Sequence, residues 1–249
     1  MVEQIVLNKI SKSYVTSQGQ KKLPVLNNLS IKIQKGEFVS ILGPNGCGKS
    51  TLLRIIAGLD SADSGKVLFH GIDQKNMKVG YLPQSNNTLL PWFNSKENIA
   101  FALSDSKSNN DSIALNKLAD FWISDYALFY PYQLSGGLKQ MVGIARASAI
   151  SDILLFDEPL TGLDQSNSKI VENAFFKLKD GNNTAVIVSH DIDTAVLFSD
   201  KIVILSEKPS SIVAVISVGL GPRRTSEMRY SDAFLGIRKQ VYEILTRGQ

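Results

Sequence analysis

The chain has 249 residues, of which 43% are hydrophobic and 20% charged, and its formal net charge is +4. These ordinary fractions exclude wholesale disorder, and the single cysteine excludes an intramolecular disulfide framework and a cysteine-based zinc site. No apolar run approaches the roughly 18–20 residues of a membrane helix, and no basic start with an apolar core marks a secretory signal, so we expect a cytosolic protein.

Strand-like and helix-like patterns alternate along the sequence. In the first third of the chain we expect strands at 31–33 and 38–42, a helix at 51–59, and strands at 66–69 and 79–82. Mostly helical structure follows at 95–125, with a polar break at 104–112, and then strands at 153–156 and 185–188 around a helix at 166–179. The chain is expected to end with a strand at 212–218 and a helix whose apolar face carries Phe234, Ile237, Val241, Ile244 and Leu245. The fully apolar strands indicate a buried parallel sheet, hence an α/β fold with an all-helical insertion.

A phosphate-binding loop is predicted after the strand at 38–42. The pattern G-x-x-x-x-G-K-[ST] is matched by Gly43, Pro44, Asn45, Gly46, Cys47, Gly48, Lys49 and Ser50. Gly43 and Gly48 allow a tight turn in which backbone N–H groups face one phosphate, and the following helix N-terminus adds positive potential. Lys49 can reach the β- and γ-phosphates, and Ser50 can offer its hydroxyl to Mg²⁺. The alternative is a glycine-rich turn with an exposed lysine.

Two acids follow the apolar strand at 153–156. Asp157 is expected to hold Mg²⁺ directly or through water, because an acid at the end of such a strand lies beside the phosphate loop. Glu158 comes next and could polarise an attacking water as a general base. The alternative is that both acids only cap the turn at Pro159.

The segment Leu134–Gln140, with the sequence LSGGLKQ, resembles the signature motif of ATP-binding cassette (ABC) ATPases. The family's other motifs follow in order, with Gln84 similar to the Q-loop glutamine, Asp164 to the D-loop acid, His190 to the switch histidine and Tyr14 to the aromatic that stacks on adenine. The resemblance implies a P-loop NTPase with a mainly parallel core sheet, an antiparallel β subdomain and an inserted helical subdomain. Its parts are an ATP-binding core at 1–84 and 151–221, a helical signature subdomain at 85–150, and a basic C-terminal tail with an amphipathic helix at 222–249.

The resemblance assigns roles to the matching residues. Those expected to act in catalysis are Glu158, His190, Lys49 and Gln84, and the expected Mg²⁺ ligands are Ser50, Gln84 and Asp157. The residues expected to contact ATP are Tyr14, Gly43, Pro44, Asn45, Gly46, Cys47, Gly48, Lys49, Ser50, Thr51, Ser135, Gly136, Gly137, Gln140 and Asp164. Simpler interpretations stay open: Tyr14 as half-buried packing, Gln84 as a loop glutamine, and His190 as a strand-end histidine.

Ser135, Gly136 and Gly137 precede a predicted helix, so the chain has a second anion-binding helix N-terminus, unless the three residues form only a helix cap. In the family, the signature of one subunit closes over the P-loop nucleotide of another, head to tail. We therefore expect ATP and Mg²⁺ as cofactors, and a second ATPase subunit, expected to be another copy of this chain, as partner.

Softer motifs resemble the nitrate/sulfonate/taurine importer branch, namely Leu89–Trp92, Asn98–Ala100, Leu205–Pro209 and Pro222–Arg224. The resemblance implies a peripheral ATPase subunit at the cytoplasmic face of the membrane that drives a separate integral membrane permease. A substrate-binding protein would act indirectly, and no nucleic acid is expected. Trp92, Phe93 and Trp122 either help to form the permease docking surface or fill the core of the insert.

Two residues stand out within the motifs. Met141 follows the signature glutamine where the family commonly has arginine, and we expect this change to remove a surface or interface contact. Cys47 lies beside a helix N-terminus, which favours a reactive thiolate. Its alkylation is expected to block ATP binding, unless Cys47 is a small loop filler.

Three rival classes are disfavoured. A cassette ATPase of DNA repair or translation usually carries two cassettes, coiled-coil insertions or zinc ligands. A P-loop kinase or GTPase leaves Leu134–Gln140 and His190 unexplained. A regulatory nucleotide-binding module without turnover would not need Glu158 and His190.

The net charge is concentrated at the C-terminal end. Residues 222–249 hold six Lys and Arg and three acids, a local +3 out of the overall +4. This is not the basic stripe of a nucleic-acid binder. We expect a solvated tail, with a membrane or regulatory contact as alternatives.

Overall fold

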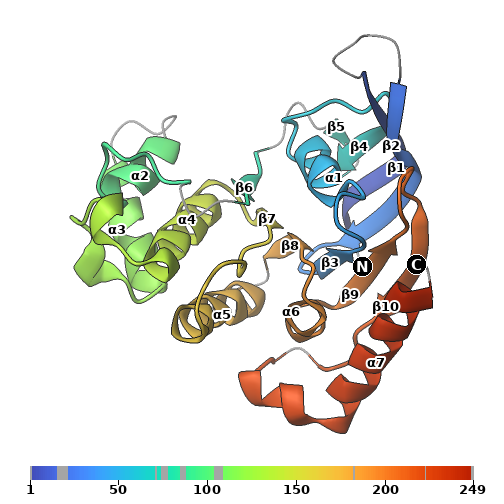
Figure 1. Ribbon diagram of the computed structural model, residues 1–249. Coiled ribbons are helices and arrows are strands. Elements are labelled where there is room, and N and C mark those ends of the chain that lie inside the picture. Colours follow the sequence, from blue (N-terminus) through green and yellow to red (C-terminus); the bar gives the residue numbers. More distant parts are fainter. Residues whose placement is uncertain are drawn as a thin grey trace. The chain divides into compact units, whose positions relative to one another are not determined.

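The structure, a computed structural model, describes residues 2–15, 22–70, 72–73, 78–84, 88–103, 109–181, 183–221 and 223–247. The chain forms two compact units, which are drawn in Figure 1 with colours that follow the sequence. The first unit comprises residues 1–77 and 182–249, and the second comprises residues 78–181. The second unit contains the expected helical subdomain together with neighbouring strands and a helix, and the boundaries 85 and 150 stay a prediction.

The first unit contains an antiparallel sheet with the strand order β2-β1-β4-β5. Its strands are β1 (Glu3–Val15), β2 (Lys22–Gln34), β4 (Ser64–Phe69) and β5 (Ile72–Asp73). Leu7 pairs with Ile31, and both side chains are buried. The register then shifts where Lys9 and Asn28 each take a φ of 54°, as expected at bulges. This sheet is the antiparallel β subdomain that the family resemblance implied.

The first unit also contains four neighbouring strands in the order β10-β9-β3-β8. They are β3 (Phe38–Leu42), β8 (Thr184–Val188), β9 (Lys201–Leu205) and β10 (Ile212–Ser217). β3 runs parallel to both β8 and β9, whereas β10 is antiparallel to β9. All five residues of β3 and of β8 are buried. The uninterrupted apolar runs in the sequence therefore mark parallel strands that are covered on both faces.

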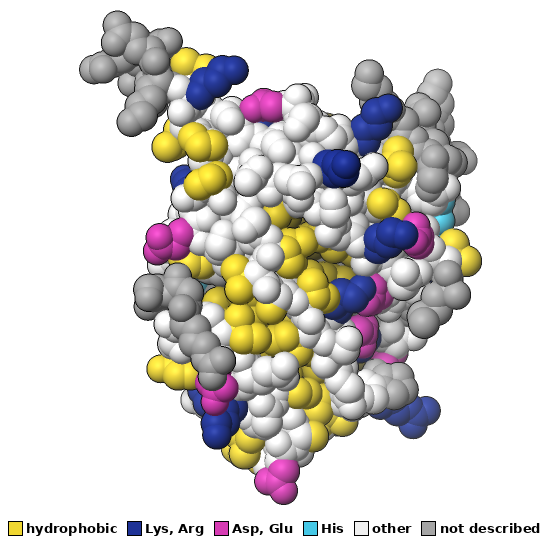
Figure 2. Space-filling model, turned by 90° about the vertical axis from the view of Figure 1, so that its right-hand side faces the viewer, with side chains coloured by type: hydrophobic (Ala, Val, Ile, Leu, Met, Phe, Trp, Pro, Cys, Tyr) yellow, Lys and Arg dark blue, Asp and Glu magenta, His cyan; other side chains and the backbone are white. Residues whose placement is uncertain are grey.

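The outer strand β10 is less covered than its neighbours. Val213 and Val215 are 52% and 55% exposed, whereas Ile216, on the opposite face of the strand, is buried. Figure 2 views the side of the molecule on which β10 lies in Figure 1, and hydrophobic side chains gather across the middle of that face. The antiparallel edge is thus the part of this sheet with the most exposed apolar surface.

Two helices of the first unit follow the strands β3 and β8, and the C-terminal arm (residues 223–247) adds two more. The helices are α1 (Lys49–Ile56), α6 (Ile192–Phe198), η4 (Ser226–Tyr230) and α7 (Asp232–Arg247). Both η4 and α7 contact α6, and α7 buries Phe234 and Val241. Burial of two such side chains contributes about 3–6 kcal/mol of transfer free energy. The expectation of a solvated tail is therefore wrong, because an apolar stripe fastens the arm to the core.

A buried cation also fastens the C-terminal arm. The Arg224 side chain is 1% exposed, and its Nη2 donates to the carbonyl oxygens of Ser199 and Val218 at 3.2 and 3.4 Å. Ser199 is the C-cap of α6, where carbonyls lack partners within the helix. Arg238 of α7 pairs with Asp193 near the other end of α6, with 2.5 Å between Nε and Oδ1. The basic residues of the arm thus include structural ones.

The second unit combines a parallel strand pair, β6 and β7, with helices. Its elements are β6 (Gly80–Leu82), α2 (Ser95–Ala102), α3 (Asn110–Asp120), η2 (Ser124–Tyr126), η3 (Pro131–Gln133), α4 (Gly136–Ile150), β7 (Ile153–Asp157) and α5 (Gln165–Asp180). α4 is the central helix, since it contacts α2, α3, α5 and both strands. Across the described residues of both units, no helix has the length and apolar character needed to cross a membrane.

Two glycines allow α4 to approach β6 closely. A Cβ atom on Gly80 would lie 2.3 Å from the carbonyl oxygen of Ala147, and one on Gly143 would lie 2.7 Å from Leu82 Cδ1. Both distances are far below van der Waals contact, so a larger residue at either position would force the helix away from the strand.

A buried asparagine organises the segment before α2. Asn98 is fully buried, and its Nδ2 donates to the carbonyl oxygens of Leu90, Phe93 and Asn94 at 2.9–3.1 Å. Its Oδ1 accepts the Leu90 N–H at 2.8 Å. One amide therefore provides hydrogen-bond partners for backbone groups at both ends of a loop that has no regular secondary structure.

We predict that Asn98→Ala lowers the free energy of unfolding of the second unit by about 2–4 kcal/mol, because several buried backbone groups lose their partner. Both tryptophans, Trp92 and Trp122, belong to this unit, so urea unfolding followed by tryptophan fluorescence measures it. The matched control is Asn116→Ala on the exposed face of α3, which should change stability by less than about 0.5 kcal/mol. Equal effects of the two substitutions would contradict this role of Asn98.

Candidate functional site

The phosphate loop in the first unit connects β3 to α1, as predicted. Its glycines are required by close contacts, since a Cβ atom on Gly43 would lie 2.9 Å from the Leu205 carbonyl oxygen. A Cβ atom on Gly48 would lie 2.7 Å from Val25 Cγ1, and the φ of Gly48 is 116°. Around Gly46, in contrast, no atom lies within 4 Å of a Cβ position. The loop is thus packed against the protein at both ends and open in the middle.

Lys49 is the first residue of α1 and is only 6% exposed. Its Nζ donates to the carbonyl oxygens of Gly43 and Pro44 at 2.8 and 3.0 Å. Neither acceptor is charged, so these contacts orient the ammonium group without neutralising it. A held cation beside an open loop and a helix N-terminus fits the phosphates of a nucleotide. Ser50 and Thr51 follow in the first turn of the same helix.

Cys47 is not an accessible thiol. The residue is 2% exposed, its N–H donates to the Pro44 carbonyl oxygen at 3.2 Å, and its own carbonyl oxygen accepts a hydrogen bond from Ser210 Oγ. A Cβ atom on Gly43 would lie 3.1 Å from Cys47 Sγ, so the thiol packs beneath the loop. This burial favours the alternative that Cys47 is a small loop filler, and the expectation that its alkylation blocks ATP binding stays a prediction.

His190 lies at the same sheet edge as the phosphate loop. It follows β8, whose Val188 pairs with Ile41 of β3, and the N–H of Ser189 donates to the Ile41 carbonyl oxygen at 3.3 Å. The carboxyl ends of adjacent parallel strands form the usual ligand-binding edge of an α/β sheet. His190 itself is exposed, and Asp191 caps α6 directly after it.

Tyr14 lies near the end of β1 and is 40% exposed. Its hydroxyl donates to Asp60 Oδ2 at 2.6 Å, and Lys12 Nζ lies 5.1 Å from the centre of its ring. Burial and the hydrogen bond to Asp60 raise the pKa of Tyr14. Burial alone would raise the pKa of Asp60, but hydrogen bonds from Lys12 and Tyr14 outweigh it and hold that pKa below its ordinary value. The tyrosine is thus ordered by charged neighbours.

The second unit holds the acids of the candidate site. Asp157 ends β7 and is 3% exposed, and Glu158 follows with a φ of 50°. A non-glycine residue in this left-handed region stores about 1–3 kcal/mol of strain and is typical of functional sites. Glu158 Oε2 accepts hydrogen bonds from Gln84 Nε2 at 2.8 Å and from Thr161 Oγ1 at 3.0 Å. The structure therefore brings the predicted general base and the Q-loop glutamine together.

Gln140 of the signature segment supports the same turn. It is 4% exposed, and its Nε2 donates to the Pro159 carbonyl oxygen at 2.9 Å. The sequence placed Gln140 among the ATP contacts, whereas here its amide holds the backbone just after Glu158. This link between the signature helix and the acidic turn has no signal in the sequence, because the two segments are distant along the chain.

The signature residues begin α4 and contact the segment after Asp164. Ser135 caps α4 by accepting the Leu138 N–H at 3.3 Å, and its hydroxyl donates to Asn167 Oδ1 at 3.2 Å. Asp164 caps α5 and accepts the Asn167 N–H and side-chain amide, each at 2.8 Å, which lowers the pKa of Asp164. Asn167 thus joins two helix N-termini. Sequence reasoning missed it, although its position three residues after the Asp164 cap is a recognisable capping pattern.

The structure corrects the interpretation of Met141. This residue is 1% exposed and faces the interior of the second unit. The expectation that it replaces a surface or interface contact is wrong, because the position belongs to the buried side of α4.

Aromatic side chains of the second unit reach the surface. Trp92 and Trp122 are each 65% exposed, and Lys177 Nζ lies 5.4 Å from the Trp122 ring. Phe93 is partly covered and lies 5.4 Å from the Phe101 ring. The alternative that the tryptophans fill the core of the insert is therefore wrong. Exposed aromatics of this size favour a contact surface.

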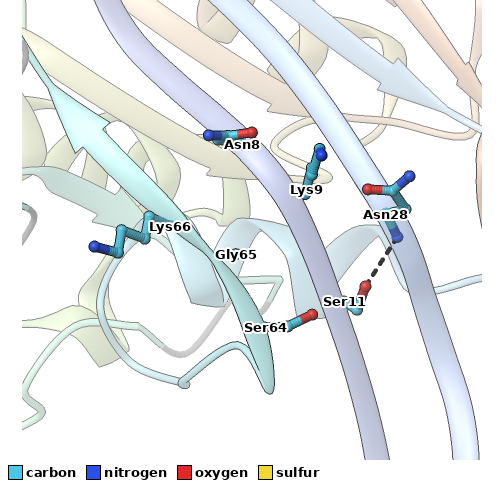
Figure 3. Close-up of a pocket in the computed structure, with 7 residues that line it drawn as sticks. All are labelled: Asn8, Lys9, Ser11, Asn28, Ser64, Gly65 and Lys66. Carbon is cyan, nitrogen blue, oxygen red and sulfur yellow. Dashed lines mark hydrogen bonds between the residues drawn. The ribbon is translucent and has the colours of Figure 1, made fainter.

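A separate depression of about 480 Å³ lies on the antiparallel sheet. Figure 3 shows the residues that line it, which are Asn8, Lys9, Ser11, Asn28, Ser64, Gly65 and Lys66. Ser11 Oγ accepts the Asn28 N–H at 3.0 Å there. None of these residues was predicted to act in the site. The depression lies where the bulges at Lys9 and Asn28 interrupt the strand register, and its lining side chains are mostly exposed.

Comparisons with known proteins agree with this geometry. The ABC transporter family profile matches residues 26–161. The aliphatic sulfonates import ATP-binding protein SsuB of Bacillus cereus is 36% identical over 253 residues, which covers 98% of this chain and 96% of that protein. The bicarbonate transport ATP-binding protein CmpC of Synechocystis sp. is 35% identical and covers 98% of this chain but 38% of that protein. A solved dimeric ATP-binding cassette, in a post-hydrolysis state with ADP and Pi, has a TM-score of 0.75 and 30% identity and covers 86% of this chain and 98% of that chain.

The fold and the two sets of motifs define an ATP-binding cassette ATPase. The chain belongs to the ABC transporter family. The predicted fold class, ATPase activity and importer-type resemblance are confirmed by these comparisons, which favour them over the DNA-repair, translation and non-hydrolysing alternatives.

Gly137 is predicted to be irreplaceable in the signature, because a Cβ atom there would lie 2.4 Å from Asn167 Oδ1. Gly137→Ala should lower the free energy of unfolding by about 1–2 kcal/mol, although alanine is the better helix former. Gly136→Ala is the matched control, since its Cβ would make an ordinary contact of 3.4 Å with Leu163. Urea unfolding followed by tryptophan fluorescence compares the two, and a Gly137→Ala protein as stable as Gly136→Ala would refute this packing.

Proposed function

We propose that this chain is the ATP-hydrolysing subunit of an ABC importer, bound peripherally to the cytoplasmic face of the membrane and driving a separate permease. The observation that carries the proposal is the hydrogen bond between Gln84 and Glu158 at 2.8 Å. It joins a residue expected to bind Mg²⁺ to the residue expected to activate water. A nucleotide-binding module without turnover would not need an oriented acid at this position.

In this proposal the first unit binds the nucleotide. Lys49 and the backbone of the phosphate loop hold the β- and γ-phosphates, and Tyr14 stacks on the adenine base. Supporting this assignment, Lys49 is already oriented by Gly43 and Pro44, and the loop is open at Gly46. The positive end of the helix dipole and the ammonium group of Lys49 each attract the negatively charged phosphates.

Three residues are proposed to hold Mg²⁺. The donor set is Ser50, Gln84 and Asp157, a hydroxyl, an amide and a carboxylate, which suits a hard cation that prefers oxygen ligands. When bound, Mg²⁺ neutralises developing charge on the phosphate oxygens. Asp157 is held in place for this role by its position at the end of the buried strand β7.

For hydrolysis, Glu158 takes a proton from the attacking water as general base. Gln84 and Thr161 fix the direction of its carboxylate, and Gln140 secures the following turn. His190 contacts the γ-phosphate and supports the water. Orientation of a base within hydrogen-bond reach contributes about 10²–10⁴-fold to such reactions.

We further propose that two copies of the chain act together. The N-terminus of α4, with Ser135, Gly136 and Gly137, provides the second phosphate-binding end, which serves the nucleotide held by the partner copy. Asn167 links this helix end to Asp164, because it accepts a hydrogen bond from Ser135 and donates one to Asp164. A head-to-tail pair would thereby have two equivalent composite sites.

The exposed aromatics of the second unit are the proposed docking surface for the permease. Trp92 and Trp122 suit this role because large exposed aromatic side chains commonly anchor protein interfaces. The transported solute is proposed to be a small anion or related compound of the nitrate, sulfonate or taurine kind, delivered by a binding protein. Its identity is tested by purifying the permease that binds this chain and measuring which solute stimulates ATP hydrolysis.

We predict that Glu158→Gln binds MgATP but lowers kcat for ATP hydrolysis by about 10²–10⁴-fold, because glutamine cannot accept the proton. The variant should also form a dimer with MgATP in size-exclusion chromatography, since the nucleotide is not consumed. Phosphate release measures turnover, and the matched control is Glu207→Gln at an exposed position, which should keep normal activity. Near wild-type turnover of Glu158→Gln would disprove the general-base role.

A further inference from the structure

We infer that Lys12 and Asp60 are positioning residues that hold the Tyr14 ring as the platform for the base of ATP. This inference rests on the proposed function, in which Tyr14 stacks on adenine. The two charged residues act through Tyr14 and not on the nucleotide itself.

The Asp60 carboxylate uses both of its oxygens to order this cluster. Oδ2 accepts the Tyr14 hydroxyl at 2.6 Å, and Oδ1 accepts Lys12 Nζ at 2.8 Å. Lys12 Nζ also donates to the Ser61 carbonyl oxygen at 2.6 Å. The ring of Tyr14 is therefore held at its backbone end by β1 and at its hydroxyl end by Asp60, which fixes its tilt.

Lys12 also faces the ring itself. Lys12 and Tyr14 are two residues apart on β1 and so point to the same side of the strand. The ammonium group lies 5.1 Å from the ring centre, within the range of a cation–π contact. With a cation over one face of the ring, the opposite face is the one that a base can stack on.

The charges around Lys12 favour this arrangement. Lys12 contacts Asp60 closely and Asp63 at 4.0 Å, and its side chain is 11% exposed. Asp63 Oδ2 also accepts the Ser13 N–H at 2.7 Å, so a second carboxylate fastens the same stretch of β1. Paired acids keep the lysine over the ring when its stem would otherwise be free to rotate.

Helix α1 connects this platform to the phosphate loop. The helix begins at Lys49, and just beyond its end the Asp60 N–H donates to the Arg54 carbonyl oxygen at 3.3 Å. One short helix therefore carries the lysine for the phosphates at its start and the acid that orients the base platform after its end. The separation between the two ends of the nucleotide site is set by that helix.

The competing interpretation is that Lys12 and Asp60 only fasten β1 to the loop after α1. Such a fastening would act on the phosphate loop as well, through α1. The two interpretations differ in which part of the nucleotide loses affinity when the cluster is broken.

The test measures dissociation constants for MgATP and for magnesium tripolyphosphate, which has the phosphates but no base. The variants are Asp60→Asn and Lys12→Met, which keep side-chain size, together with Tyr14→Phe and Tyr14→Ala. Stacking on an aromatic ring is worth about 1–3 kcal/mol, so Tyr14→Ala should raise the dissociation constant for MgATP about 5- to 140-fold. Smaller effects are expected for Asp60→Asn, Lys12→Met and Tyr14→Phe, because each removes only part of the stacking energy. Each should raise the dissociation constant for MgATP by about 3- to 10-fold and change that for tripolyphosphate by less than about twofold.

The control is Lys66→Met, an exposed lysine of the same sheet, which should leave both dissociation constants unchanged. Equal weakening of MgATP and tripolyphosphate by Asp60→Asn and Lys12→Met would overturn the inference in favour of a purely structural fastening. Unchanged MgATP binding in those variants, with weakening in Tyr14→Ala, would also overturn it while leaving the proposed stacking intact. If Tyr14→Ala leaves the dissociation constant for MgATP unchanged, the proposed stacking of Tyr14 on adenine is wrong.

Discussion

The phosphate loop is packed tightly against neighbouring residues at both of its ends, and much of the first unit follows from that packing. Gly43 approaches the Leu205 carbonyl oxygen, and Gly48 approaches Val25 of β2. These contacts leave no room for side chains, so the loop is held by its surroundings before any ligand arrives. A preorganised loop binds its ligand more tightly, because little conformational entropy is lost in ordering the loop when the ligand binds. The same tight packing explains why Cys47 is buried under the loop.

The turn that carries Glu158, the proposed general base, depends on a different kind of constraint. Glu158 occupies a left-handed backbone conformation, which is unfavourable for glutamate and must be held by other contacts. Gln140 binds the next residue of the turn, and Gln84 and Thr161 bind the carboxylate. The signature helix and the acidic turn are therefore parts of one hydrogen-bonded arrangement within the second unit. Strain at a reacting group and support from its surroundings are the usual combination in enzymes.

The sequence predicted the parts of the fold that have local patterns. The buried strands β3, β7 and β8, the helices α4 and α5, and the glycine-rich loop were all visible, because periodicity and spacing are properties of short segments. The roles of Asn167 and Asp60 were not predicted, because neither residue belongs to a recognised motif. Both act on partners that are distant in sequence, Ser135 for Asn167 and Tyr14 for Asp60. Burial was the other weak point: Met141 was expected at a surface or interface and the C-terminal arm in solvent, yet both are packed, and the thiol of Cys47, expected to be reactive, is buried. Burial depends on tertiary neighbours, which no single segment reveals.

The packing of α7 on α6 changes how the C-terminal arm has to be regarded. Phe234 and Val241 are buried, and Arg224 donates to the carbonyl oxygen of Ser199, the C-cap of α6. α6 begins one residue after Asp191, which follows His190. Deletion of the arm would uncover an apolar stripe on the helix that begins just after His190, the proposed switch histidine. The arm is therefore an integral segment of the folded domain, and shortened forms of the protein that stop before residue 232 would be prone to aggregate.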